Sequence, residues 1–409
     1  MVSNKDASTE TRAEAAVREG RPAEAVGLYR CLLEQAGPWG RSCERWLEGL
    51  GGAYKASGQR VQAGYVLMAL RHFEKAMACF DRDQQGFLWA LCAEAQGLFR
   101  EAADSYKSAD APALAAMAWE RAGDHGNAVA QWRSILDHPR LRGRSYETAL
   151  VHFNLARVFR IADDRVHAQR EATLCQRMLE ASADDFETIG QRERALDSYA
   201  TLMRLGRDTG SFENVAEGTL NSIRLLGDSE QRLLILQYYD DFLEFAAQAG
   251  EWHAAAMLAC ETADFCAKLG MPFDRHYRQR AVSLWHEAAR QNQQASGPVE
   301  ISQNALLASI DVAASLNDLH MVGRLYSALA ELDLSAAEKS RYAALATRYA
   351  TASPLPAVEP PPSQHWRHED AYPEVWLSDL IEWELGGKAE RVMARLLVDA
   401  STLLRVRRG

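Results

Sequence analysis

Two short segments in the last fifty residues contain residue types that can do chemistry. Residues 365–370 bring two His, one Glu and one Asp together, and imidazole and carboxylate groups so close in sequence can bind a metal ion. The segment follows a Pro-rich stretch, so we favour a solvated loop over a metal site. Residues 386–388 are Gly-Gly-Lys, but they lack the upstream Gly of a phosphate-binding loop and are followed by Ala389. We interpret them as the end of a helix.

The sequence contains neither a His-Glu-x-x-His zinc motif nor a Gly-x-Ser-x-Gly nucleophile motif. Its seven cysteines are an odd number and no two have the Cys-x-x-Cys spacing, which argues against a disulfide framework or a zinc knuckle. Cys and His side chains could still meet in the folded chain as nucleophile and base, as in a hydrolase, but their spacing does not predict it. We therefore expect a protein that is not an enzyme and that uses no cofactor and no metal.

Four arginines form two pairs with the same spacing, Arg157 with Arg160 and Arg204 with Arg207. A guanidinium makes paired, charge-assisted hydrogen bonds with carboxylates, so these arginines are candidate binding residues for an acidic segment of a partner. The alternative is that they lie near helix C-termini, where cations favour the helix dipole and pair with nearby acids.

Both pairs must be positioned by helices, and the clearest helices are predicted between residues 86 and 136. Two copies of a helix–turn–helix unit follow one another there. In each copy a turn Gly, Gly97 or Gly123, is followed by Ala five residues later and by an aromatic residue nine residues later. The Ala and the aromatic residue share one helix face, where the small Ala leaves a space (the niche) and the aromatic side chain can fill one (the plug). The Gly can adopt a positive φ, and Asp110 is expected to cap the helix of the second copy, with Pro112 in its first turn.

The same offsets recur elsewhere in the chain. They are clear at Gly20 and Gly58, and weaker copies are present at three later turn positions: Asp163, Gly210 and Gly250. The niche at Ala76 follows the preceding niche closely, so we expect only short helices over residues 64–82. Farther along, the periodicity predicts four longer helices, at residues 276–292, 301–316, 319–331 and 335–350.

This arrangement resembles the tetratricopeptide repeat, whose helix pairs stack into a superhelix. The unit around Gly58 matches best, because Leu50 and Tyr54 also occupy positions of the family pattern. The step from Ala102 to Ala128 is 26 residues, shorter than the family period of about 34. The resemblance implies an all-α fold, a right-handed α-solenoid of tetratricopeptide-like hairpins. We expect Ala102 and Ala128 to be buried where adjacent helices approach closely.

In the tetratricopeptide family the first helix of each pair lines the concave groove. By this resemblance Arg157, Arg160, Arg204 and Arg207 lie on groove positions of two neighbouring hairpins. Other hairpins carry mostly acidic residues there, with Lys55 as an exception. These acidic residues are Glu48, Glu94, Glu120, Asp240 and Glu244. The resemblance therefore implies a basic strip between acidic regions. The Lys and Asn carboxylate clamp of chaperone-binding relatives is not matched, since Glu48 and Gly52 stand at those positions.

The order of these segments predicts five regions. They are a disordered N-terminus at residues 1–10, tetratricopeptide-like repeats at 11–136, a solenoid continuation with longer helices at 137–351, a Pro-rich linker at 352–372 and a C-terminal helical hairpin at 373–409. Five of the twelve prolines fall between residues 354 and 362, which makes the linker stiff and extended. We expect the hairpin either to cap the solenoid or to dock on a second partner.

The charge and hydropathy of the chain restrict its location and its partners. A formal net charge of −10 argues against binding to nucleic acid or to an anionic membrane surface. The N-terminal residues lack the apolar core of a signal peptide, and no apolar run is long enough to span a membrane. We therefore expect a soluble, cytoplasmic protein. Only seven of the 46 basic residues are Lys, which is typical of a GC-rich bacterial genome.

Taken together, these features predict a non-enzymatic adaptor or scaffold for protein–protein interaction. It would bind a protein or peptide partner with an acidic segment in the concave groove of the solenoid. The alternative is a regulatory module that senses a ligand or a signal peptide by changing the pitch of its superhelix.

Overall fold

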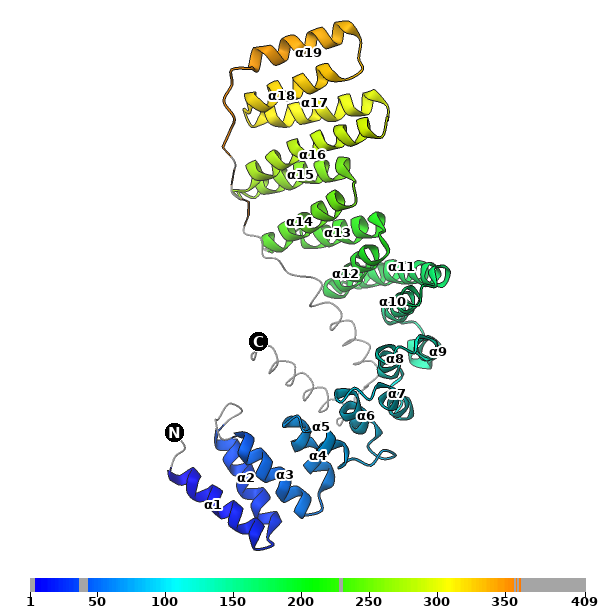
Figure 1. Cartoon of the computed structure of the whole chain (residues 1–409), viewed down its shortest axis with the longest axis vertical. Helices are drawn as coiled ribbons and strands as arrows, with labels where there is room; N and C mark the ends of the chain where they lie inside the picture. Colours follow the sequence, from blue (N-terminus) through cyan, green and yellow to red (C-terminus); the bar gives the residue numbers. More distant parts are fainter. Residues whose placement is uncertain (1–3, 37–42, 228–230, 357, 359, 362–409) are drawn as a thin grey trace. The chain divides into compact units, whose positions relative to one another are not determined.

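The computed structural model of the chain describes residues 4–36, 43–227, 231–356, 358 and 360–361 (Figure 1). The regular elements in these residues are α-helices and one short 3-10 helix, η1, so the predicted all-α fold is confirmed. In the described part of the chain, none of the helices combines the length and the apolar character that crossing a membrane requires.

The described residues form two compact units, which we call the N-terminal unit and the C-terminal unit. The N-terminal unit extends to Cys175 and the C-terminal unit begins at Gln176, so the division falls within helix α11 (Arg165–Thr188). The helices of the N-terminal unit before α11 are α1 (Asn4–Arg18), α2 (Pro22–Ala36), α3 (Cys43–Ala56), α4 (Arg60–Ala69), α5 (Phe73–Met77), α6 (Gly86–Ala95), α7 (Phe99–Ser108), α8 (Pro112–Arg121), α9 (His125–Leu136), η1 (Pro139–Leu141) and α10 (Ser145–Ile161).

The C-terminal unit continues with eight further helices. They are α12 (Arg192–Thr209), α13 (Phe212–Leu226), α14 (Arg232–Gln248), α15 (Trp252–Lys268), α16 (Asp274–Gln294), α17 (Val299–Ser315), α18 (Leu319–Glu331) and α19 (Ala336–Tyr349). Within each unit every α-helix packs on the next one along the chain, from α1 to α10 and from α12 to α19. This serial packing of antiparallel helices is the tetratricopeptide-like solenoid arrangement that the repeats predict.

The repeat offsets describe the packing correctly. Gly97 and Gly123 adopt φ angles of 79° and 73°, the left-handed conformation in which Gly ends a helix without steric cost. Ala102 and Ala128 are fully buried, as expected. The aromatic plugs four residues later, Tyr106 and Trp132, are fully buried too. The small residue therefore lets the helices approach, and the aromatic residue fills the space beside it.

Two local expectations are wrong. Asp110 is not the N-cap of α8, because Ala111 takes that place and Pro112 follows it in the first turn. Asp110 instead adopts a φ of 56° after the end of α7, the turn position that Gly occupies elsewhere. The N-terminal segment also differs from the expectation of disorder, since α1 already begins at Asn4. Glu10 of this helix is buried and pairs with Arg45 of α3 at 2.5 Å, which ties the segment to the repeat stack.

The expected helix lengths agree with the structure. Helices α4 and α5, of ten and five residues, confirm the short helices predicted for residues 64–82. The four longer helices predicted after residue 276 correspond to α16, α17, α18 and α19. The predicted C-terminal hairpin and most of the Pro-rich linker, residues 362–409, lie outside the described residues. The beginning of the linker is described, and it follows α19 as an extended segment (Figure 1).

Candidate functional site

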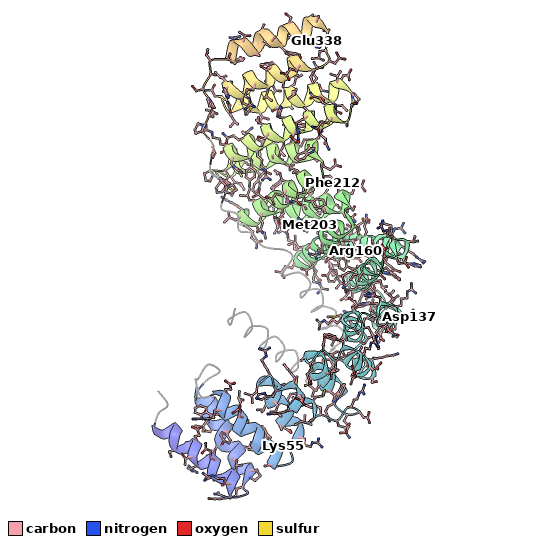
Figure 2. All side chains as sticks on the ribbon, in the orientation of Figure 1. Lys55, Asp137, Arg160, Met203, Phe212 and Glu338 are labelled. Carbon is pink, nitrogen blue, oxygen red and sulfur yellow. The ribbon has the colours of Figure 1, made fainter. Side chains whose placement is uncertain are left out.

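The first predicted arginine pair lies near the end of α10 in the N-terminal unit, where Figure 2 labels Arg160. Arg157 forms an ion pair with Glu120 of α8, with 2.6 Å between Nη2 and Oε2. The same Nη2 donates a hydrogen bond to Oδ1 of Asn154, 3.1 Å away. The side chain of Arg157 keeps 30% of its surface exposed, so this guanidinium is held in place but remains accessible.

The second pair lies near the end of α12 in the C-terminal unit. Arg204 forms an ion pair with Asp208 one turn later, with 3.2 Å between Nε and Oδ1, and its side chain is 28% exposed. The guanidinium of Arg207 lies 5.5 Å from the ring centroid of Phe245 in a cation–π contact. The two arginine pairs thus belong to different units, and each of them is anchored by residues of its own unit.

The ion pair of Arg157 is one instance of a contact that recurs. Three times in the described part of the chain, a Glu three residues before a turn Gly accepts a hydrogen bond from the aromatic residue nine positions after that Gly. The same Glu also pairs with an Arg of a later helix. The three sets, which we call clasps, are Glu94 with Tyr106 (2.7 Å) and Arg121, Glu120 with Trp132 (2.8 Å) and Arg157 (2.6 Å), and Glu187 with Tyr199 (2.8 Å) and Arg224 (2.6 Å).

The clasps change the acidity of their members. The hydrogen bond from Arg224 holds the pKa of Glu187 below its usual value, against the opposing effect of desolvation. Burial and the bond to Glu187 raise the pKa of Tyr199 to about 12. Burial, together with Glu94, also raises the pKa of Tyr106. At neutral pH the clasp of Glu187 therefore contains an ionised carboxylate, a neutral phenol and a cation. Each of the three clasps joins successive helices of one unit.

Some acidic residues at predicted groove positions also have cationic partners. Asp240 and Glu244 of α14 lie 3.6 Å and 4.0 Å from the guanidinium of Arg280 in α16. Burial raises the pKa of Asp240, and Arg280 opposes this shift. Glu94 and Glu120 belong to clasps, as described above. The charges that the repeat frame assigns to the groove are thus largely paired with other residues of the chain.

A different feature, which the sequence did not predict, lies in the C-terminal unit. After α19 the chain runs back as an extended segment, and we call its described residues 352–356, 358, 360 and 361 the strap (Figure 1). His320, in the first turn of α18, contacts the carbonyl oxygen of Ala352 through Nδ1 at 3.1 Å. Gln279 of α16 contacts the strap twice. Its Nε2 donates to the carbonyl of Pro356, and its Oε1 accepts from the amide of Val358, both at 3.3 Å.

A third side chain reaches the strap backbone from α16. Desolvation and nearby Arg280 lower the pKa of His276, and the backbone of Val358 and the carboxylate of Asp240 oppose this shift. Neutral His276 is therefore favoured, and a neutral imidazole still carries one N–H that can donate to a carbonyl. His276, Gln279 and His320 thus form a row of polar side chains on α16 and α18 that contacts backbone atoms of the strap.

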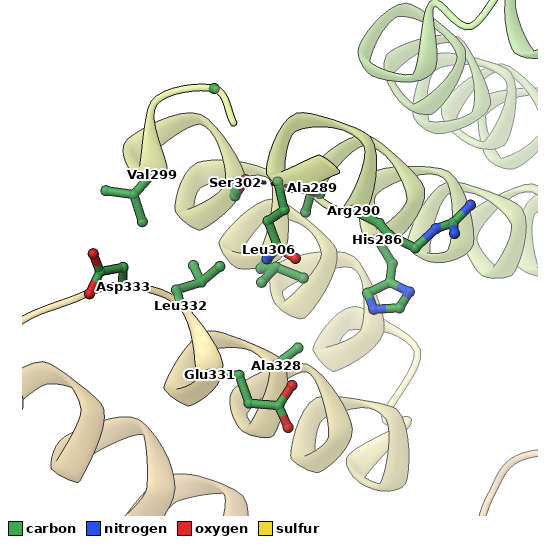
Figure 3. A pocket seen from close by; sticks show the side chains of 12 residues that line it. His286, Ala289, Arg290, Val299, Ser302, Leu306, Ala328, Glu331, Leu332 and Asp333 are labelled. Carbon is green, nitrogen blue, oxygen red and sulfur yellow. Dashed lines mark hydrogen bonds between the residues drawn. The ribbon is translucent and has the colours of Figure 1, made fainter. Parts of the chain in front are cut away.

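A cavity of about 410 Å³ lies farther along the C-terminal unit, among α16, α17 and α18 (Figure 3). Its polar lining includes His286 and carries both signs of charge, from Arg290, Glu331 and Asp333. Arg290 is already paired with Glu287, with 2.9 Å between Nε and Oε2. A lining of mixed charge, with Leu306 and Leu332 as apolar neighbours, does not select one class of ligand.

No group of three or more His, Cys, Asp and Glu side chains is placed for metal binding among the residues that the structure describes. The possible metal ligands at residues 365–370 lie outside them. The clasps could have been found in the sequence, because Glu and an aromatic donor flank the turn Gly at constant offsets. The strap site had no such signal, since its three polar residues come from two helices and bind backbone atoms.

Comparison with known proteins finds no matching family model and no matching curated protein. Among solved structures, the apo form of RapI aligns over 85% of this chain and 86% of that chain, with 9% identity and a TM-score of 0.28. Naa15/Naa10 bound to HypK-THB aligns over 86% and 64%, with 11% identity and a TM-score of 0.30. A Rap protein complexed with competence and sporulation factor aligns over 99% of both chains, with 12% identity and a TM-score of 0.24. Likeness this distant carries no inference about function.

Proposed function

We propose that this protein is a repeat scaffold that binds a protein or peptide partner on the faces of its stacked helices. The observation that carries the proposal is the strap. In the C-terminal unit, side chains of two helices hold an extended segment of polypeptide by its backbone. A stack of helices that can hold one extended segment has the donors and acceptors to hold another.

The arginine pairs are the proposed contacts for acidic residues of the partner. Arg157 and Arg204 are partly exposed, and their intramolecular partners Glu120 and Asp208 fix the direction of each guanidinium. A guanidinium that is already oriented loses little conformational entropy when a second carboxylate binds to its free edge. We propose that each arginine pair faces a concave surface of its own unit, and that acidic residues of the same unit help to set the register of the partner.

The test is binding of the partner to charge-neutralised variants. After capture of the partner with the wild-type chain from its native host, titration calorimetry would compare the wild type with Arg157→Gln/Arg204→Gln. Gln removes the charge without placing a second carboxylate beside Glu120 or Asp208. We expect roughly tenfold weaker binding for this double variant, equivalent to about 1.4 kcal/mol, and a smaller dependence of its affinity on salt.

The chain offers a matched control in Arg121→Gln/Arg224→Gln. These two arginines also pair with glutamates, one in each unit, but they lie outside the predicted groove positions. The control should bind the partner like the wild type. Equal losses in both double variants would mean that the arginines act only through the stability of the helix stack, and wild-type affinity in the first variant would remove them from the binding site.

A further inference from the structure

The contacts between the strap and the C-terminal unit use the backbone of the strap. Gln279 and His320 bind carbonyl or amide groups of the segment, and His276 interacts with the backbone of Val358. Gln279 is the central contact, because its amide group is a donor to one residue and an acceptor from another. A side chain that binds both a C=O and an N–H of one segment recognises the position and direction of the backbone, whichever side chains the segment carries.

The burial of the strap has a period of three. Ala352, Leu355 and Val358 are half-buried and Pro361 is buried, whereas the described residues between them are exposed. A polyproline II helix has three residues per turn, so every third side chain lies along the same edge. The composition agrees with this conformation, since four of the residues from 354 to 361 are Pro. The strap therefore presents one edge of a polyproline-II-like segment to the C-terminal unit.

The strap is held weakly for a segment of its length. Leu355 and Val358, the two largest apolar side chains of the described strap, are only half-buried, and Pro361 is the one buried residue among its described members. The two bonds from Gln279 are 3.3 Å long, which is at the long end for such contacts. What keeps the strap in place is largely its attachment to α19, because a short tether gives an effective concentration of about millimolar. A free segment with better-fitting side chains can compete with such an internal ligand.

We propose that the row formed by His276, Gln279 and His320 is a binding site for a proline-rich segment in the polyproline II conformation, and that the strap occupies this site as an internal ligand until a partner displaces it. The proposal rests on the proposed function as a peptide-binding scaffold and names the class of peptide. Gln279 would align the backbone of the ligand, and the edge at every third residue would select side chains of moderate size.

The first experiment measures binding of a free peptide to the full-length chain. The probe is a fluorescein-labelled peptide with the sequence of residues 351–361, Thr-Ala-Ser-Pro-Leu-Pro-Ala-Val-Glu-Pro-Pro. It would be titrated by fluorescence anisotropy against the wild type and against Leu355→Asp/Val358→Asp, which places two charges on the buried edge of the strap. We expect the peptide to bind the variant roughly tenfold or more tightly than the wild type, because the site is then no longer filled in cis.

Two controls decide whether this binding uses the proposed site. Adding Gln279→Ala to the strap variant should abolish the gain, whereas adding Gln294→Ala, at the exposed last position of the same helix, should leave it unchanged. A peptide that carries the same two Asp substitutions should not bind. The proposal is overturned if the peptide binds the variant and the wild type equally, or if neither binds it while the far-ultraviolet circular dichroism of both is the same.

A second measurement does not depend on the strap variant. Hydrogen exchange of the Val358 amide, followed in ¹⁵N-valine-labelled full-length protein, should be roughly tenfold faster in Gln279→Ala than in the wild type or in Gln294→Ala. Unchanged exchange would contradict the clamp. These outcomes are separate from those for the proposed function. A captured partner whose binding is unchanged by Gln279→Ala would support the proposed scaffold and contradict only the proline-rich class of ligand.

Discussion

At the scale of single residues, the clasps explain why charged side chains occur at positions that the repeat frame assigns to a groove. Glu94 lies between a buried phenol and a half-exposed guanidinium, and both of them donate to it. Leaving a buried donor without its acceptor reduces the free energy of unfolding much more than removing the donor and the acceptor together. This asymmetry gives each clasp a stabilising role and allows the role to be measured separately from partner binding.

The clasp at Glu94 can be tested by a double-mutant cycle. Glu94→Ala removes the acceptor of Tyr106, which is fully buried, so we expect the free energy of unfolding to fall by about 1–3 kcal/mol. Tyr106→Phe removes the donor and leaves Glu94 paired with Arg121, so its cost should be smaller. The double variant should lose less stability than the two single variants together, as measured by urea unfolding. Strict additivity would show that the two groups do not interact.

At the scale of elements, α12 and α13 illustrate how a departure from the repeat pattern follows from close helix packing. A Cβ on Gly218 of α13 would lie 2.6 Å from the carbonyl oxygen of Tyr199 and 2.6 Å from Cγ of Met203, both on α12. From the other side, a Cβ on Gly206 would lie 2.8 Å from the backbone nitrogen of Val215. Gly206 stands four residues before the turn Gly210, as Tyr54 stands before Gly58, and the close approach of α12 and α13 leaves no room there for a side chain.

Gly218→Ala is therefore expected to destabilise the protein, by about 1–3 kcal/mol, because backbone atoms cannot yield as a flexible side chain can. Gly52→Ala is the matched control, since Gly52 lies within α3 and a Cβ there would meet nothing within 4 Å. Removing a Gly from a helix without a clash should raise stability by roughly 0.5–1 kcal/mol. Thermal unfolding of both variants is the measurement, and a stabilised Gly218→Ala would show that α12 and α13 are farther apart.

At the scale of the whole molecule, a repeat stack needs its terminal helices covered, because each helix otherwise leaves an apolar face without a neighbour. In the C-terminal unit the strap returns from α19 past α18 to α16. The predicted hairpin at residues 373–409 lies outside the described residues, so its role as a cap remains a prediction.

Two truncations separate the contributions of the strap and of the later residues. A chain that ends at Ala352 loses the contacts to Gln279, whereas a chain that ends at Pro361 keeps them. If the hairpin is the cap, both truncated chains should expose apolar surface and self-associate in size-exclusion chromatography with light scattering. If both stay monomeric with the melting temperature of the full chain, the hairpin is not a cap. Association of the shorter chain alone would assign the covering role to the strap.

The sequence by itself was sufficient for the repeat architecture, because local offsets carry that information. The spacing in sequence from Gly97 to Ala102 and Tyr106 is a property of one helix pair, and its repetition predicts how successive pairs stack. Asp110 shows where local reasoning fails, since its side chain is typical of an N-cap and the structure uses its tolerance of positive φ instead. Both uses are compatible with the same residue, and the packing of α7 against α8 decides between them.

The partners of the charged residues were decided only by the tertiary structure. Arg157 and Arg204 have the same type and spacing in the sequence, yet one pairs with a different helix and the other with a residue of its own helix. The row of His276, Gln279 and His320 depends even more on the fold. Its ligand is a backbone segment that joins the helices more than 70 residues after Gln279, and hydrogen bonds to backbone atoms leave no pattern of side chains to find.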